Sequence, residues 1–233
     1  IKPEEIPGID LYMDQVTTFM ESQLAASKRH TDDKILTKTM INNYAKNDLL
    51  PPPVKKKYTK EHLLMLTFIY YFKNILSISD IQVLLGPLTE KYFNHNGEMS
   101  LTDIYEEIMH LELKQIDPLT KDIVRKYKMA CDSYENAEEE NQDFLKKFAF
   151  ICMLSFDVYL KKQVIEKLID DMAEPKNSKK HAPHPAVASV LSNVTDNQNA
   201  ALGDRPQSSI FICYSLFILC LNTSTAITST TAA

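Results

Sequence analysis

The sequence predicts an all-α protein, and three observations lead to this prediction. Only four glycines occur in 233 residues, whereas hairpins and nucleotide-binding loops need glycine where the backbone angle φ is positive. Between Val54 and Glu174 only Pro87 and Pro118 interrupt the chain, so long helices are permitted there. Apolar residues recur three and four positions apart over much of this length, as they do on one face of an α-helix.

Two helices are predicted before residue 50, with a polar, basic loop over residues 27–34 between them. The apolar face of the first consists of Tyr12, Val16, Phe19, Met20 and Leu24. The shorter second helix has a face formed by Leu36, Met40, Ile41 and Tyr44. Thr37 stands where its side chain can cap this helix. The helix must end by Leu50, because Pro51-Pro52-Pro53 excludes helix for itself and for the residue before it.

A third and a fourth helix are predicted between residues 59 and 87. Thr59 is the expected cap of the third, whose centre at residues 63–72 is apolar almost all round. Ten residues cannot span a bilayer, so this segment is predicted to be a buried core helix. Ser77 and Asp80 have the spacing of a capping box and begin the fourth helix. Gly86-Pro87 is expected to end it.

Residues 88–174 are predicted to form three more helices. One runs from about Leu101 to Ile116 after a Ser100 cap, and the next begins at Pro118 with Asp117 as its cap. The last runs from about Asn141 to Met172. Its broad apolar face consists of Phe144, Phe148, Ile151, Cys152, Val158, Tyr159, Ile165, Leu168, Ile169 and Met172. A helix with so much apolar surface needs a partner, either within the chain or in a second subunit.

The composition changes beyond Pro175, which divides the chain into three predicted parts, 1–86, 87–174 and 175–233. Residues 176–209 are rich in Asn, Ser, Pro and Ala, as linkers are. The apolar run from Ile210 to Leu221 is shorter than the roughly twenty residues of a membrane span. An irregular apolar tail is therefore expected, with a weak tail anchor as the alternative and no other membrane contact.

Charge is distributed unevenly along the chain. Residues 28–87 carry ten Lys and Arg against five Asp and Glu, whereas residues 88–174 carry eleven against nineteen. A basic block inside an acidic protein points to an anionic partner for that block. The alternative is an ordinary solvated surface.

A motif with specific spacing lies between Leu36 and Leu85. Residues 36–45 read LTKTMINNYA, residues 46–52 read KNDLLPP, and the basic segment Lys56-Lys57-Tyr58 follows. These segments resemble MerR-type regulators, whose recognition helix reads V-S-x-x-T-[IL]-R-Y-Y-E and is followed by G-L-L-x-P and then by R-x-Y. Asn42 and Lys56 replace family arginines, and Asp48 replaces the family glycine, a position where Asp tolerates the left-handed conformation. Residues 13–58 also resemble an uncharacterised bacterial family called domain of unknown function 1836.

The resemblance implies a MerR-like winged helix-turn-helix domain at 1–86 and a helical C-terminal domain at 87–174 for dimerisation or for an unidentified small-molecule effector. The recognition helix would span about 37–46 and the wing about 51–58. Asn side chains can read adenine edges, and Lys side chains neutralise phosphates. The expected protein is a cytoplasmic, dimeric transcriptional regulator that binds double-stranded DNA. The residues expected to contact DNA are Thr37, Lys38, Thr39, Asn42, Asn43, Lys46, Lys55, Lys56, Lys57 and Tyr58.

The sequence gives little sign of catalysis, and no cofactor, metal or catalytic residue is expected. Glu107 and His110 have the E-x-x-H spacing of di-iron bundles, but such sites need a second copy of this motif and further glutamates. His181 and His184 have no cysteine partner nearby. The alternative to a DNA-binding regulator is a helical protein-interaction scaffold that has lost DNA binding.

Overall fold

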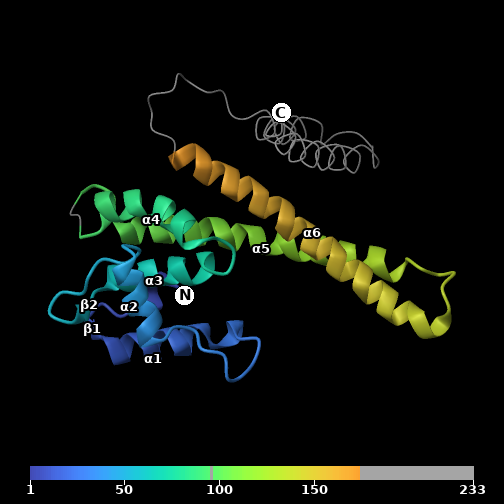
Figure 1. The fold of residues 1–233 in the computed structure, drawn as a ribbon, viewed down its shortest axis with the longest axis horizontal. Helices are drawn as coiled ribbons and strands as arrows, with labels where there is room; N and C mark the ends of the chain where they lie inside the picture. Colours follow the sequence, from blue (N-terminus) through green and yellow to red (C-terminus); the bar gives the residue numbers. More distant parts are fainter. Residues whose placement is uncertain (95–96, 174–233) are drawn as a thin grey trace, which may run out of the picture. The chain divides into compact units, whose positions relative to one another are not determined.

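Six α-helices and one two-stranded sheet make up the part of the chain that the computed structural model describes, residues 1–94 and 97–173 (Figure 1). This confirms the predicted all-α class. The predicted linker and apolar tail at 175–233 lie outside the described residues. No helix in the described ranges is long and apolar enough to cross a membrane.

The chain begins with a 3-10 turn, η1 (Pro3–Glu5), and a short strand, β1 (Leu11–Tyr12), which leads into α1 (Met13–Leu24) and η2 (Ala25–Ser27). The prediction that Tyr12 lies on the inward face of the first helix is wrong. Tyr12 belongs to β1, which pairs antiparallel with β2 (Lys57–Tyr58) in the register Leu11 to Tyr58 and Tyr12 to Lys57. Because side chains alternate along a strand, Leu11 is buried and Tyr12 is exposed.

The helix α2 (Lys38–Lys46) begins and ends as the local sequence predicts. The Thr37 side chain accepts a hydrogen bond from the Met40 backbone N–H at 3.2 Å, which confirms the cap. After the helix, Asp48 has a φ of 53°, and the Leu49 N–H donates to the Tyr44 carbonyl at 2.9 Å. This is the Schellman arrangement, in which the residue in the left-handed conformation is usually glycine. The expectation that Asp48 adopts this conformation is therefore confirmed.

The left-handed conformation of Asp48 can be tested by its effect on the free energy of unfolding. Asp48→Val should lower the free energy of unfolding by about 1–2 kcal/mol, because a β-branched residue is strained at positive φ. Asp48→Gly should keep or slightly raise it. Denaturant unfolding of the two variants and the parent measures both effects. Equal stability of the valine and glycine variants would contradict the assigned conformation.

The helix α3 (Lys60–Phe72) runs through the core. All its residues from His62 to Tyr70 are buried, which confirms the predicted core helix up to Tyr70, whereas Tyr71 at its end is exposed. The next helix, α4 (Ile78–Tyr92), opens with the predicted capping box, in which Ser77 and Asp80 bond each other's backbone N–H groups. It does not end at Gly86-Pro87 but continues to Tyr92. A proline inside a helix removes one hydrogen bond, and here the segment beyond it stays helical while Leu88 and Tyr92 pack against the core.

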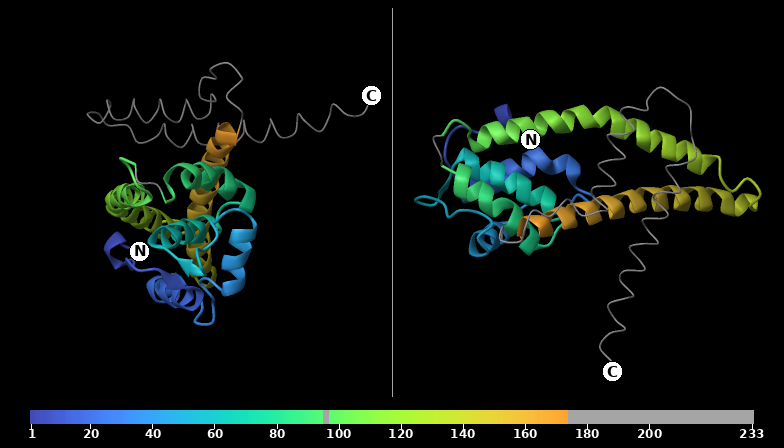
Figure 2. Two further views of the ribbon diagram at one scale, coloured as in Figure 1. Left: turned by 90° about the vertical axis from the view of Figure 1, so that its left-hand side faces the viewer. Right: turned by 90° about the horizontal axis from the view of Figure 1, so that it is seen from above.

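The last two helices, α5 (Leu101–Cys131) and α6 (Glu139–Ala173), form an antiparallel pair (Figures 1 and 2). The prediction of separate helices before and after Pro118 is wrong, because α5 passes through this residue without a break. Proline lacks one N–H donor, and a helix anchored on both sides tolerates that loss. On one side Tyr105 lies in the core, and on the other Lys126 forms ion pairs with Asp122 and with Asp157 of α6.

Residues 1–174 form one compact unit. Its core joins the first four helices to both later ones, since Leu101 and Tyr105 of α5 and Ile169 of α6 belong to the same buried cluster. The predicted boundary after residue 86 falls inside α4. A division of residues 1–174 into a DNA-binding part and a dimerisation part stays a prediction.

Candidate nucleic-acid interface

The two sides of α2 differ in exposure as the sequence predicts. Ile41 and Tyr44 are buried against the core. Asn42 and Asn43 are exposed. The same outward side includes Thr39 and Lys46, whereas Thr37 is half-buried because it caps the helix. The exposed side of α2 therefore consists of amide, hydroxyl and ammonium groups, which can donate hydrogen bonds to base edges and phosphates.

Lys38 differs from the other predicted contact residues because its charge is already engaged in an ion pair. Its ammonium group forms an ion pair with Asp14, in the first turn of α1. Both side chains are largely exposed, so the pair contributes little to stability and can exchange for a phosphate. Nothing in the sequence pattern pointed to Asp14, because the pairing depends on how α1 and α2 pack.

The segment after α2, residues 51–58, forms a small hairpin with lysines at its tip. The Lys57 N–H donates to the Val54 carbonyl at 2.9 Å, and the two residues between them, Lys55 and Lys56, have φ angles of 50° and 67°. Positive φ at both central positions defines a type I′ turn, which favours Asn-Gly. Lysine at both positions is strained, and such strain is typical of functional loops. Both lysines are exposed.

The remaining two predicted wing residues lie at the base of this hairpin. The Lys57 ammonium group lies 5.5 Å from the centre of the Tyr12 ring. Tyr58 is buried and its ring meets His62 edge-on, with the ring centres 5.4 Å apart. The structure therefore brings Lys57 together with the exposed lysines, whereas the ring of Tyr58 anchors the hairpin in the core.

His62 is a fully buried side chain that fixes the base of the hairpin, and the sequence analysis did not single it out. Its Nδ1 accepts a hydrogen bond from the Thr59 N–H at 3.0 Å, so the neutral ring carries its proton on Nε2. Nε2 faces the backbone of Pro51 and Pro52 but makes no well-formed hydrogen bond. Burial lowers the pKa of His62 below its ordinary value of 6.5, against the opposing effect of these backbone groups.

The His62 environment predicts a pH dependence of stability. The unfolded chain binds a proton at this histidine near pH 6.5, whereas the folded chain does so only at a lower pH. Between these two pKa values the unfolded state holds more protons, so the free energy of unfolding should fall as the pH drops below about 6.5. His62→Gln should flatten this dependence. The matched control is His110→Gln, at an exposed histidine. Denaturant melts between pH 5 and 8 give the slopes, and equal slopes in both variants would contradict the assignment.

Contacts within the basic block show which positive charges are already engaged. Lys28 forms an ion pair with Glu21, and this contact lowers the pKa of the Glu21 carboxyl. Lys73 donates to the Ile35 carbonyl at 3.1 Å. By contrast, within the described ranges no ion pair involves any of four lysines on α2 and the hairpin, Lys46, Lys55, Lys56 and Lys57. Arg29, Lys34 and Lys60 of the block also have no ion pair in these ranges, so α2 and the hairpin carry four of its uncompensated charges and the only group of three in consecutive positions.

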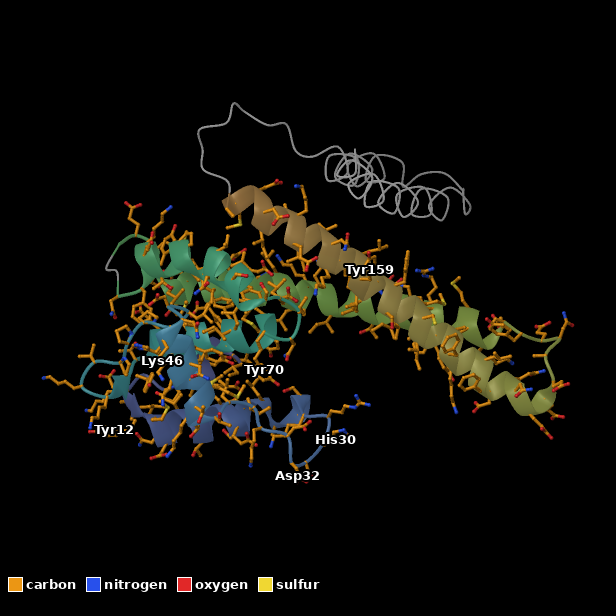
Figure 3. The ribbon with its side chains drawn as sticks, viewed as in Figure 1. Tyr12, His30, Asp32, Lys46, Tyr70 and Tyr159 are labelled. Atoms are coloured by element: carbon orange, nitrogen blue, oxygen red, sulfur yellow. The ribbon has the colours of Figure 1, made fainter. Side chains whose placement is uncertain are left out.

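Both α2 and the hairpin lie at one end of residues 1–174, away from the turn between α5 and α6 (Figures 1 and 2). Lys46 and Tyr12 lie toward this end in Figure 3. Gln82 of α4 donates a hydrogen bond to the Asn47 carbonyl at 2.6 Å, and this contact fixes the C-terminal end of α2. Within the described residues no three His, Cys, Asp or Glu side chains gather as metal ligands. The exposed groups of α2 and the hairpin thus offer a ligand hydrogen-bond donors and positive charge, and no metal site.

The comparison of the sequence with known protein families gives one match. Residues 1–108 match the sequence model of the domain of unknown function DUF1836. The matched span contains α1 to α4 and the beginning of α5, and it confirms the resemblance to this uncharacterised family. No curated protein and no solved structure matches the chain.

Proposed function

We propose that the chain is a DNA-binding transcriptional regulator with a MerR-like winged helix-turn-helix module, in which α2 enters the major groove and the 51–58 hairpin is the wing. One observation carries the proposal. The exposed side of α2 carries Asn42, Asn43 and Lys46, and the neighbouring hairpin has three lysines without ion-pair partners in the described structure. Recognition helices use amide side chains for bases, and wings use cations for phosphates.

A dimer is the second part of the proposal. Both α5 and α6 keep large apolar side chains exposed although they pair with each other. On α6 these include Phe144, Phe148, Ile151, Val158 and Tyr159, the last of which is labelled in Figure 3. A large exposed apolar surface of this kind marks an interaction site. A second copy of the chain supplies a matching apolar surface, and a two-fold dimer would recognise an inverted repeat in DNA.

The same apolar surface also favours the second candidate function, a helical scaffold that binds other proteins. The two candidates differ in what the N-terminal residues do. A scaffold would not need the strained lysine turn or the exposed amides of α2, and it would not bind DNA in a salt-dependent way. Enzymatic activity forms no part of either proposal.

The experiment that tests the proposal is selection from random DNA duplexes by the purified full-length chain, followed by sequencing. A regulator should enrich a specific, inverted-repeat sequence. Its affinity should fall steeply with salt, by roughly 0.9 in the log–log slope for each neutralised phosphate. Absence of both enrichment and salt-dependent retention would favour the scaffold.

Asn42 and Asn43 allow sequence reading to be separated from general DNA affinity. Asn42→Ala or Asn43→Ala should leave the free energy of unfolding within about 0.5 kcal/mol, since both side chains are exposed. Either change should reduce the preference for the selected sequence over random DNA by roughly 1–3 kcal/mol if it removes a bidentate base contact. The ratio of specific to non-specific affinity at fixed salt is the measurement.

Asn141→Ala, at an exposed asparagine near the start of α6, is the matched control and should leave this ratio unchanged. Tyr44→Ala should instead destabilise the fold, because it empties a buried position. If neither α2 asparagine variant alters the ratio, α2 does not read bases.

A further inference from the structure

The strand β1 places a tyrosine at the proposed interface that the helical spacing of the sequence had assigned to the core. Tyr12 follows the buried Leu11, and the alternation of strand side chains turns it outward, where it is 53% exposed. The same register puts it directly opposite Lys57 of β2. Its exposure is thus a consequence of the regular pairing between β1 and β2.

Three groups of different chemistry meet on this outer side of the hairpin. The Lys57 ammonium group is 5.5 Å from the centre of the Tyr12 ring, a cation–π distance. Val54, which bridges to Lys57 across the turn, is 61% exposed. A phenol, an isopropyl group and an ammonium group therefore share one small surface next to the exposed Lys55 and Lys56.

We propose that Tyr12, together with Lys57 and Val54, binds the sugar–phosphate backbone of duplex DNA beside the wing. This inference rests on the proposed DNA binding and adds β1 to the interface. The ammonium group pairs with a phosphate, the phenol hydroxyl donates to a phosphate oxygen, and the ring and isopropyl group pack on deoxyribose C–H groups. The charge favours DNA as the occupant, since the hairpin lysines have no carboxylate partner in the described part of the chain.

The ring and the charge make separable contributions, which fixes the design of the experiment. Fluorescence anisotropy of the full-length protein on a random-sequence duplex is measured over a range of salt concentrations. Tyr12→Ala should weaken binding about tenfold with an unchanged salt slope, because it removes a hydrogen bond and packing but no charge. Lys57→Ala should weaken binding and also lower the log–log slope by about 0.9. Tyr12→Phe should fall between the parent and Tyr12→Ala.

Tyr134→Ala is the matched control, at an exposed tyrosine in the turn between α5 and α6, and should leave DNA affinity unchanged. Tyr12 contributes only its backbone N–H to the start of α1, so its side chain can be changed without loss of that contact.

If the parent binds DNA and Tyr12→Ala binds equally well, this inference is overturned while DNA binding stands. If the parent binds no DNA, the proposed function fails and this inference fails with it. Tyr12-dependent binding of polyglutamate, without Tyr12-dependent DNA binding, would overturn the inference in favour of an acidic protein partner.

Discussion

Replacing Lys55, Lys56 and Lys57 together with alanine is expected to weaken binding to all DNA sequences on the order of 100-fold at ~0.1 M salt. The log–log salt slope should fall by up to about 2.7, since three phosphate contacts are lost. Preference for one sequence over another should change little, because phosphate contacts carry no sequence information. Titrations of selected and random duplexes at several salt concentrations measure all three effects.

The control for this variant must remove the same charge elsewhere. Lys114, Lys121 and Lys128 are exposed along α5, so their joint replacement by alanine lowers the net charge equally. If this control weakened DNA binding as much as the wing variant, the effect would reflect overall charge, and the wing would have no special role. Unchanged binding in the wing variant would contradict the wing assignment directly.

A second variant of the hairpin changes the strained turn itself, and its stability and its DNA affinity should change in opposite directions. Lys55→Asn with Lys56→Gly gives the turn the residues that a type I′ conformation favours, so the free energy of unfolding should rise by about 1–2 kcal/mol. DNA binding should nevertheless weaken, because two positive charges are lost. A variant that is more stable but binds less tightly would show that the lysines stand in this turn for binding, at a cost in stability.

The starts of three helices and the end of α2 could be predicted from the sequence because they depend on nearby residues. Thr37, Ser77 and Ser100 each accept a hydrogen bond from a backbone N–H three residues later, as their spacing predicts. The left-handed conformation of Asp48 also follows from local chemistry, because the chain must turn sharply between α2 and the wing. The split of α2 into a buried and an exposed side needs only the helical period.

Interruptions within helices could not be predicted in the same way. The local sequence predicts helix boundaries at Pro87 and Pro118, although both lie inside continuous helices. A proline removes one hydrogen bond, and whether the helix continues depends on packing on either side of it. That packing joins residues distant in sequence, such as Lys126 and Asp157.

The site shows the same division between local and long-range information. Asn42, Asn43 and the hairpin lysines follow from a motif, whereas Tyr12, Asp14 and His62 acquire their roles only through tertiary contacts. The spacing of Tyr12 fits a helix as well as a strand, and only its pairing with Lys57 decides between them. No motif marks His62 in the sequence, and its full burial beneath the 51–58 hairpin lowers its pKa.

The exposed apolar stripe of α6 leads to the other prediction with a large effect. Phe144, Phe148 and Ile151 recur at intervals of four and three residues, the spacing of a helix–helix contact. They remain exposed because α6 uses other residues toward α5, where Phe150 meets Tyr127 and Asp157 meets Lys126. A helix of 35 residues is about 50 Å long, which gives a second copy a long surface to bind.

Phe148→Glu with Ile151→Glu is therefore expected to raise the dimer dissociation constant by at least about 100-fold, because association would bury carboxylates in an apolar contact. The folded monomer should persist, since both side chains are exposed within one chain. Sedimentation velocity from about 1 to 100 µM measures the equilibrium, and thermal melting checks the fold. Gln115→Glu with Gln163→Glu adds the same charge at exposed positions of α5 and α6, and this control should stay dimeric.

The consequence for DNA distinguishes a functional dimer from incidental association. A monomeric variant keeps α2 and the wing, so its affinity for a single half-site should match that of the parent chain. Its affinity for the full inverted repeat should drop to that same level, because linking two half-site contacts in one molecule multiplies affinity. If the parent is a monomer at tens of micromolar, the dimer proposal is wrong. If the variant is monomeric yet binds the inverted repeat as tightly as the parent, two-fold recognition through α6 is wrong.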